Sequence, residues 1–156
     1  GEIGTGGWSK KEGLYCVFNS YKGDLEKPSF KISYLTHEAQ HNIDMQNKKY
    51  CMSSPLLEYR AKLAELVYYP NLELFESFLL HAKNDKNLSH PLAQFWLISD
   101  LSLLVFNQDY VNDIKQWESK LSDIQQHSSE LLLNYNRCKT NWVMGILNYY
   151  IRALVV

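Results

Sequence analysis

Helical periodicity dominates the chain beyond Pro70 and limits its possible folds more than any other feature. In this part the apolar residues recur at intervals of three and four, and short polar loops such as residues 84–87 and 107–109 interrupt the pattern. We therefore expect helices over residues 72–83, 91–106, 110–133 and 136–154. Ser89 and Asp109 are candidate caps for two of these helices.

The N-terminal part of the chain carries one predicted strand. Residues 1–12 are rich in Gly and Lys, and we expect them to form no regular element. Residues 13–21 combine aromatic and β-branched side chains and are followed by the turn signal Lys22-Gly23-Asp24, which indicates a strand that ends in a turn. The expected fold class is therefore mainly α (α+β), with a short N-terminal β element.

The composition is that of one folded domain that neither spans a membrane nor binds nucleic acid. The 156 residues are 46% hydrophobic and 13% aromatic, which suffices for one core. The mean hydropathy is −0.34, and Ser99, Asp100 and Ser102 interrupt the most apolar tract, so we expect no transmembrane segment. A formal net charge of −1 without a basic tract gives no electrostatic footprint for nucleic acid.

The cysteines and the first residue leave the compartment open. Cys16, Cys51 and Cys138 lie far apart and form no C-x-x-C pair, which excludes a cysteine-rich zinc finger. They permit at most one disulfide and one free thiol. Because the chain begins with Gly rather than Met, an upstream signal or domain can precede it. We expect a soluble protein of unassigned localisation and oligomeric state.

Residues 37–41 read His-Glu-Ala-Gln-His, which is the pattern H-E-x-x-H. Two histidines four residues apart on a helix point the same way and can bind one metal ion. The intervening Glu38 then lies beside the metal, where its carboxylate can take a proton from bound water. The alternative is a solvated helix face whose two histidines bind nothing.

The segment around this motif has the periodicity of a helix. One apolar stripe consists of Ile32, Leu35, Ala39 and Ile43. An adjacent stripe consists of Tyr34, His37, His41 and Asp44. We expect the first stripe to face the core while the second presents the imidazoles. Ser29 is the predicted N-cap, with Pro28 just upstream.

A second helix is predicted to begin at Ser53-Ser54-Pro55, a serine cap followed by proline in the first turn. Its expected core residues are Leu56, Leu63, Ala64 and Val67. Glu58, Ala61 and Glu65 form a separate stripe. If this helix turns back on the first one, Glu58 reaches the open side of the two imidazoles. Two histidines and one glutamate would leave the fourth metal position for water.

The motif followed by Glu58-Tyr59-Arg60-Ala61 resembles the gluzincin group of zinc metallopeptidases, several of which carry the second element as Glu-x-x-Ala. The resemblance covers about residues 30–67. It implies a zincin-like helix pair, one zinc ion per chain bound by His37, His41 and Glu58, and Glu38 as the general base. The implied substrate is a peptide or protein.

This resemblance implies a single zincin-like metallopeptidase domain over residues 1–156. Residues 1–29 would be its β-containing N-terminal segment, residues 30–69 would carry the H-E-x-x-H and glutamate-ligand helices, and residues 70–156 would form a helical subdomain.

One position departs from the pattern of this group. Some of its members place Asp or Asn four residues after the glutamate ligand to hold a histidine, and that position is Lys62 here. Asp44 and Glu65 are then the candidates to orient the imidazoles. Asp44 is also an alternative third ligand, and Glu58 could simply favour the N-terminus of its helix.

Two other functions compete with peptide hydrolysis. A non-catalytic helical domain with a structural metal needs a fourth protein ligand, which Asp44 or Glu65 would supply. A di-iron helical bundle built on Glu38-x-x-His41 needs a second E-x-x-H, and the sequence contains none. The remaining histidines, His81, His90 and His127, have no partner at ligand spacing, although His90 or a tyrosine is a candidate for stabilising an oxyanion.

Overall fold

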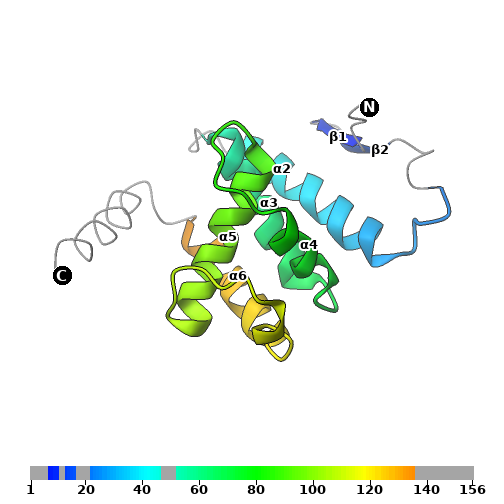
Figure 1. The fold of residues 1–156 in the computed structure, drawn as a ribbon. Helices are drawn as coiled ribbons and strands as arrows, with labels where there is room; N and C mark the ends of the chain where they lie inside the picture. The colour runs from blue at the N-terminus through cyan, green and yellow to red at the C-terminus, as the bar shows by residue number, and fades with distance from the viewer. Residues whose placement is uncertain (1–6, 11–12, 17–21, 47–51, 136–156) are drawn as a thin grey trace.

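In the computed structural model, the described residues are 7–10, 13–16, 22–46 and 52–135, and they form a short β-hairpin and a set of packed helices (Figure 1). The strands are β1 (Gly7–Lys10) and β2 (Gly13–Cys16). The helices are the π-helix η1 (Ser29–Tyr34), α2 (Leu35–Gln46), α3 (Ser54–Tyr68), α4 (Glu73–His81), α5 (Ser89–Phe106), the 3-10 helix η2 (Ile114–Gln116) and α6 (Leu121–Tyr135). The expected mainly α class is confirmed. Within the described part of the chain, no helix is both long and apolar enough to cross a membrane.

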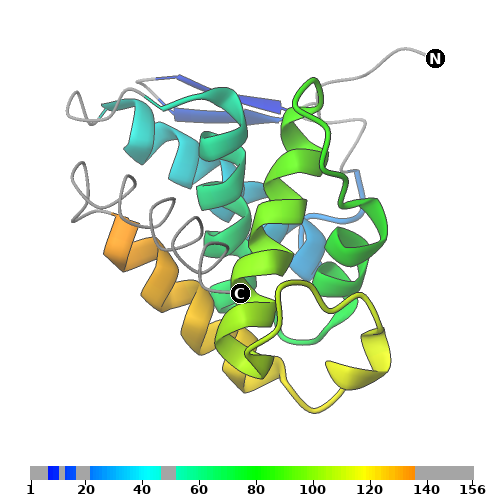
Figure 2. The ribbon, with the colours of Figure 1, turned by 60° about the vertical axis from the view of Figure 1, so that its left-hand side comes forward.

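The N-terminal hairpin lies along α2. β1 and β2 are antiparallel, with Trp8 opposite Tyr15, and both strands contact α2 (Figure 2). The Tyr34 hydroxyl donates a hydrogen bond to the Tyr15 carbonyl and so ties the hairpin to the start of the helix. The prediction that residues 1–12 form no regular element is wrong for Gly7–Lys10, because pairing with β2 satisfies backbone groups whatever the local propensity. Residues 17–21 of the predicted strand lie outside the described residues.

α3 is the central helix, because α2, α5 and α6 all pack against it. Every residue from Tyr59 to Leu66 is buried, including the polar ones. Ser53 is the N-cap and Pro55 stands in the first turn, as the sequence predicts. Leu63 and Ala64 are buried, whereas Leu56 and Val67 are half-buried. Because these residues are buried, α3 is held firmly in place and positions the side chains that face α2.

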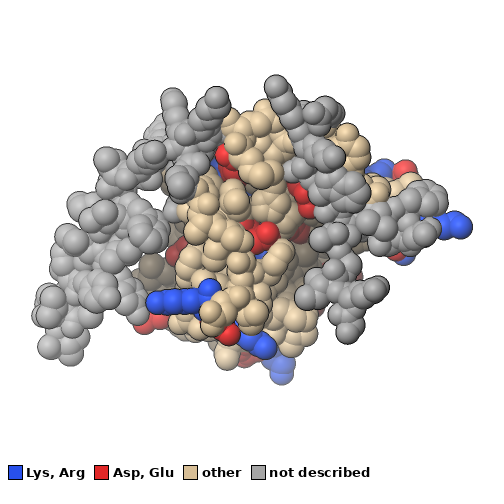
Figure 3. All heavy atoms as spheres, turned by 90° about the horizontal axis from the view of Figure 1, so that it is seen from above, with Lys and Arg blue, Asp and Glu red and all other residues tan. Residues whose placement is uncertain are grey.

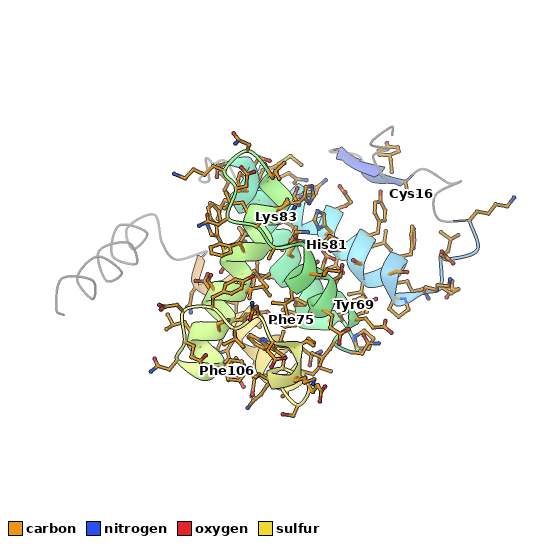
Figure 4. The ribbon with its side chains drawn as sticks, viewed as in Figure 1. Cys16, Tyr69, Phe75, His81, Lys83 and Phe106 are labelled. Carbon is orange, nitrogen blue, oxygen red and sulfur yellow. The ribbon has the colours of Figure 1, made fainter. Side chains whose placement is uncertain are left out.

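The helix predicted over residues 110–133 is wrong in its first half. Only η2 and, from Leu121, α6 are helical there. The cause is Trp117, which is fully buried, with its ring 4.6 Å from that of Phe75 and 4.7 Å from that of Phe106 between centroids. Figure 4 labels these two phenylalanines. The Trp117 indole donates to the Val111 carbonyl at 3.2 Å, so the chain folds back on itself instead of continuing as a helix. Burying this large side chain outweighs local helix propensity.

The other predicted helices differ from the structure mainly at their ends. Helices predicted over residues 72–83 and 91–106 are observed as Glu73–His81 and Ser89–Phe106. Ser89 lies inside its helix and Leu88 is the N-cap, while Asp113, not Asp109, accepts a capping hydrogen bond, from the Lys115 amide. The helix predicted over residues 136–154 lies outside the described residues.

The predicted core stripe on the first helix is wrong. Ile43 is 61% exposed, whereas Gln40 and Asp44 are buried. Ser29 makes no capping hydrogen bond, because the helix begins with Pro28 at the N-cap and a π-helical segment, η1, that runs directly into α2. A π-helix has more residues per turn than an α-helix, which changes the faces that an ideal periodicity predicts. The face of α2 with the histidines and Asp44 therefore packs against α3.

Candidate metal centre

Three side chains from α2 and α3 converge, and they are the three predicted metal ligands. The Nε2 atoms of His37 and His41 lie 2.9 Å apart. Each Nε2 atom is 3.3 Å from a carboxylate oxygen of Glu58. Two ligands held tetrahedrally at the usual zinc distances of ~2.0–2.1 Å are themselves separated by ~3.3 Å. The two nitrogen–oxygen distances, from His37 to Oε2 and from His41 to Oε1 of Glu58, equal this separation, and the nitrogen–nitrogen distance is shorter by 0.4 Å. The three side chains are therefore close enough together to share one ion.

The local chemistry of Glu58 also fits a cation. Its Oε2 atom is sealed from solvent and accepts no well-formed hydrogen bond from a described residue, although imidazole nitrogens surround it. A buried carboxylate oxygen without a donor is costly, and a metal ion would compensate it. Among the described residues, His37, His41 and Glu58 form the one group of three His, Cys, Asp or Glu side chains whose ligand atoms all lie within 4.8 Å of one another.

Glu65 contacts Nδ1 of His37, the ring nitrogen that does not face Glu58. Its Oε1 atom lies 2.6 Å from the Nδ1 atom of His37, and its Oε2 atom accepts a hydrogen bond from the Ser33 hydroxyl. A proton on Nδ1 leaves the lone pair of Nε2 free to bind a metal. Of the two orienting residues that the sequence suggests, Glu65 therefore takes that place, one turn of α3 beyond the position that Lys62 occupies.

Asp44 lies elsewhere. Its Oδ2 atom accepts a hydrogen bond from the Arg60 Nε atom at 2.8 Å, and both side chains are almost fully buried. Gln40 donates to the other oxygen at 2.9 Å. The alternative in which Asp44 is a third ligand or orients an imidazole is therefore wrong, because this carboxylate is already satisfied. Its ion pair joins α2 to α3, and Arg60 also donates to the Leu132 carbonyl of α6.

The contacts within this cluster shift the pKa values of His37 and Glu58. Burial by itself lowers the pKa of His37, but the adjacent carboxylates of Glu58 and Glu65 raise the pKa to about 9. Burial by itself raises the pKa of Glu58, yet the adjacent imidazoles of His37, His41 and His90 hold that pKa far below its usual range. Such a cluster attracts positive charge strongly, whether that charge is a proton or a metal ion.

Glu38 lies on α2 between the two histidines and is half-buried. No described residue forms a hydrogen bond or ion pair with its carboxylate. It therefore differs from Glu58 and Glu65, which are both engaged with imidazoles, and its carboxylate is free to act on a molecule from solution.

His90 lies beside Glu58, although the sequence shows no partner for it at the spacing of metal ligands. It stands in the first turn of α5, with Nδ1 3.0 Å from the Glu58 Oε2 atom, and its ring is parallel to that of His37 at 6.4 Å. Its side chain is 61% exposed, so it reaches the site from the solvent side. The sequence names His90 only as a candidate near the reacting atoms, because the approach of α5 to α3 depends on tertiary packing.

The other two histidines belong to local contacts. His81 Nδ1 lies 2.8 Å from the Ser77 carbonyl, and His127 pairs with Glu130 on the surface of α6.

Seen from the end of the molecule where α5 begins, acidic side chains lie among uncharged ones near the middle of the face (Figure 3).

Comparisons with known proteins identify no relative. No protein-family model matches the chain, and no curated protein or solved structure shows significant similarity to it. The functional argument therefore depends on the geometry of the site alone.

Proposed function

We propose that this protein is a gluzincin-type zinc metallopeptidase that hydrolyses peptide bonds with water. The observation that carries the proposal is the convergence of His37, His41 and Glu58 at the separations of one tetrahedral ion, with Glu38 unengaged on the same helix. The contact of the hairpin with α2 supports the proposal, because zincins usually place a small sheet beside the active helix, where its edge strand aligns the substrate.

Each residue has a defined part in this proposal. A bound zinc ion would supply polarisation of the scissile carbonyl and a lower pKa for water, from about 15.7 to about 7. His37 and His41 hold the ion through neutral Nε2 atoms, and Glu58 contributes the charge that balances it. Glu38 accepts the proton of the attacking water and delivers it to the leaving amine. Glu65 keeps the His37 ring in the required tautomer and orientation.

Among the described residues no fourth His, Cys, Asp or Glu joins the three candidate ligands, which favours catalysis over a purely structural metal. A closed structural site needs four protein ligands. The two residues considered for the fourth position are engaged elsewhere, Asp44 with Arg60 and Glu65 with the Nδ1 atom of His37. A di-iron site lacks its second E-x-x-H.

The proposal is tested with the full chain, its Glu38→Gln variant and a mixture of peptides, with cleavage read by mass spectrometry. Loss of Glu38 should reduce cleavage by at least about a hundredfold, in line with the contribution of a general base, while one zinc per chain is still bound. His41→Ala should lose both zinc and cleavage. Glu118→Gln, an exposed substitution after η2, should change neither. Full cleavage by Glu38→Gln, or iron instead of zinc in the purified protein, would overturn the proposal.

A further inference from the structure

An open depression of about 250 Å³ lies beside the proposed metal centre, next to Glu65. The residues that line it come from four helices: Ser29, Ser33 and Tyr34 of η1, His37 of α2, Lys62 and Glu65 of α3, and Phe78 of α4. Its walls thus combine hydroxyl groups, one ammonium group and one phenyl ring with the imidazole of His37 and the carboxylate of Glu65. His37, Glu65 and Ser33, which binds Glu65, belong to the proposed peptidase site, whereas Ser29, Lys62 and Phe78 have no part in it.

Lys62 is the unusual member of this set. Its exposed fraction is 6%, and Nζ lies over the Phe78 ring at 4.7 Å from the centroid. Among the described residues no carboxylate, carbonyl or hydroxyl pairs with this ammonium group. The attraction of one ring face is smaller than the cost of removing an ammonium group from water, so a buried lysine of this kind calls for an anionic partner.

The neighbouring carboxylate does not fill that role. Glu65 lines the same depression, but its two oxygens are bound by His37 and Ser33. Its negative charge does limit the anion that can enter, because it repels a doubly charged group more strongly than a singly charged one. The aromatic face of Phe78 offers a surface for an apolar group attached to the anion.

We propose that this depression is a binding site for a monovalent carboxylate that carries an apolar group. Lys62 pairs with the carboxylate, the Ser29 hydroxyl donates a hydrogen bond to it, and Phe78 packs against the apolar part. The ligand is either a small free acid or the C-terminal carboxylate of a peptide, and both share this chemistry. The site does not depend on peptide hydrolysis.

The test measures binding to the ¹⁵N-labelled full chain by NMR titration with four probes: benzoate, its neutral analogue benzamide, N-acetylphenylalanine and inorganic phosphate. Each titration is made with and without one equivalent of zinc, because carboxylates also bind zinc. Benzoate should shift the amide signals of Ser33, Tyr34 and Lys62 in both states. Benzamide should bind at least about tenfold more weakly, because it cannot form the charge pair.

Substitutions of lysine residues test whether benzoate binds at Lys62. Lys62→Met keeps an unbranched stem over Phe78 but removes the charge, and it should weaken benzoate binding by about tenfold or more. Lys62→Arg should retain binding, and Lys83→Met, at an exposed lysine, should bind as the unsubstituted chain does. Tighter binding of N-acetylphenylalanine than of benzoate assigns the site to a peptide terminus, and the reverse order assigns it to a free acid.

Three results would overturn the proposal: equal binding of benzamide and benzoate, binding that requires zinc, or phosphate binding more tightly than benzoate. The first comparison uses the unsubstituted chain, so it holds even if Lys62→Met fails to fold. Because no step of the test measures cleavage, failure of this proposal is distinguishable from failure of the proposed peptidase function.

Discussion

Replacing Glu65 by Gln tests how the protein prepares His37 for a metal. Glu65 is 3% exposed, and its Oε1 atom lies 2.6 Å from the Nδ1 atom of His37. Glutamine has nearly the same size, so packing in α3 is preserved while the charge is lost. The neutral amide is a weaker acceptor for the Nδ1 proton, and the imidazole loses both its fixed tautomer and part of its basicity.

We expect the substitution to weaken zinc binding by ~10–100-fold, or ~1.4–2.7 kcal/mol, the usual effect of removing a group that orients a ligating histidine. A second effect acts in the opposite direction. The pKa of His37 is raised to about 9, so the imidazole is protonated at pH 7 and zinc must displace that proton. Removing Glu65 lowers this pKa and relieves the competition. As the pH rises through 9, His37 of the unsubstituted chain loses its extra proton, and this proton no longer competes with zinc. The substitution should therefore weaken zinc binding more at pH 9 than at pH 7.

The measurement is a competition titration of zinc against a chromophoric chelator at pH 7 and pH 9. The unsubstituted chain, Glu65→Gln and the exposed control Glu118→Gln are compared, and Glu118→Gln should match the unsubstituted chain at both values. If Glu65→Gln binds zinc as tightly as the unsubstituted chain at pH 9, then Glu65 does not prepare His37 and the reasoning fails.

Three further predictions concern the buried ion pair, the proton at the metal centre and the loop before α6. Asp44→Ala removes the carboxylate that pairs with the buried Arg60 and should lower the free energy of unfolding in urea by ~3–5 kcal/mol, whereas Asp123→Ala, from an exposed pair, should cost no more than ~1 kcal/mol. Zinc binding at pH 7 should release about one proton, because the pKa of His37 is about 9, and calorimetry in buffers of different ionisation enthalpy measures that number. Ser102→Ala should cost ~1–3 kcal/mol in the same urea assay, because the Ser102 hydroxyl accepts from the buried Val111 amide.

The three candidate metal ligands could be predicted from the sequence because each depends on local periodicity. His37 and His41 need only one helix, and Glu58 needs a second helix that starts at a recognisable serine and proline. The two helices then meet with the three side chains on facing sides. Glu65 could be suggested for the same reason, since it lies two turns beyond Glu58 on one face of α3.

The remainder depends on tertiary contacts that periodicity does not contain. Asp44 shares a helix face with the histidines, but its partner is Arg60, and a buried ion pair cannot be told from a metal site by spacing alone. Trp117 ends a helical pattern because a pocket beside Phe75 and Phe106 accepts its ring. His90 reaches Glu58 only because α5 packs on α3, which no local pattern predicts.

The central claim is that His37, His41 and Glu58 together bind one metal ion, and the zinc K-edge absorption spectrum of the full chain with one equivalent of zinc tests it most directly. We expect two imidazole nitrogens and one carboxylate oxygen at ~2.0–2.2 Å, with a further light-atom ligand from solvent and no sulfur. A zinc–sulfur distance of ~2.3 Å, or a shell of oxygen atoms without imidazole, would contradict the claim.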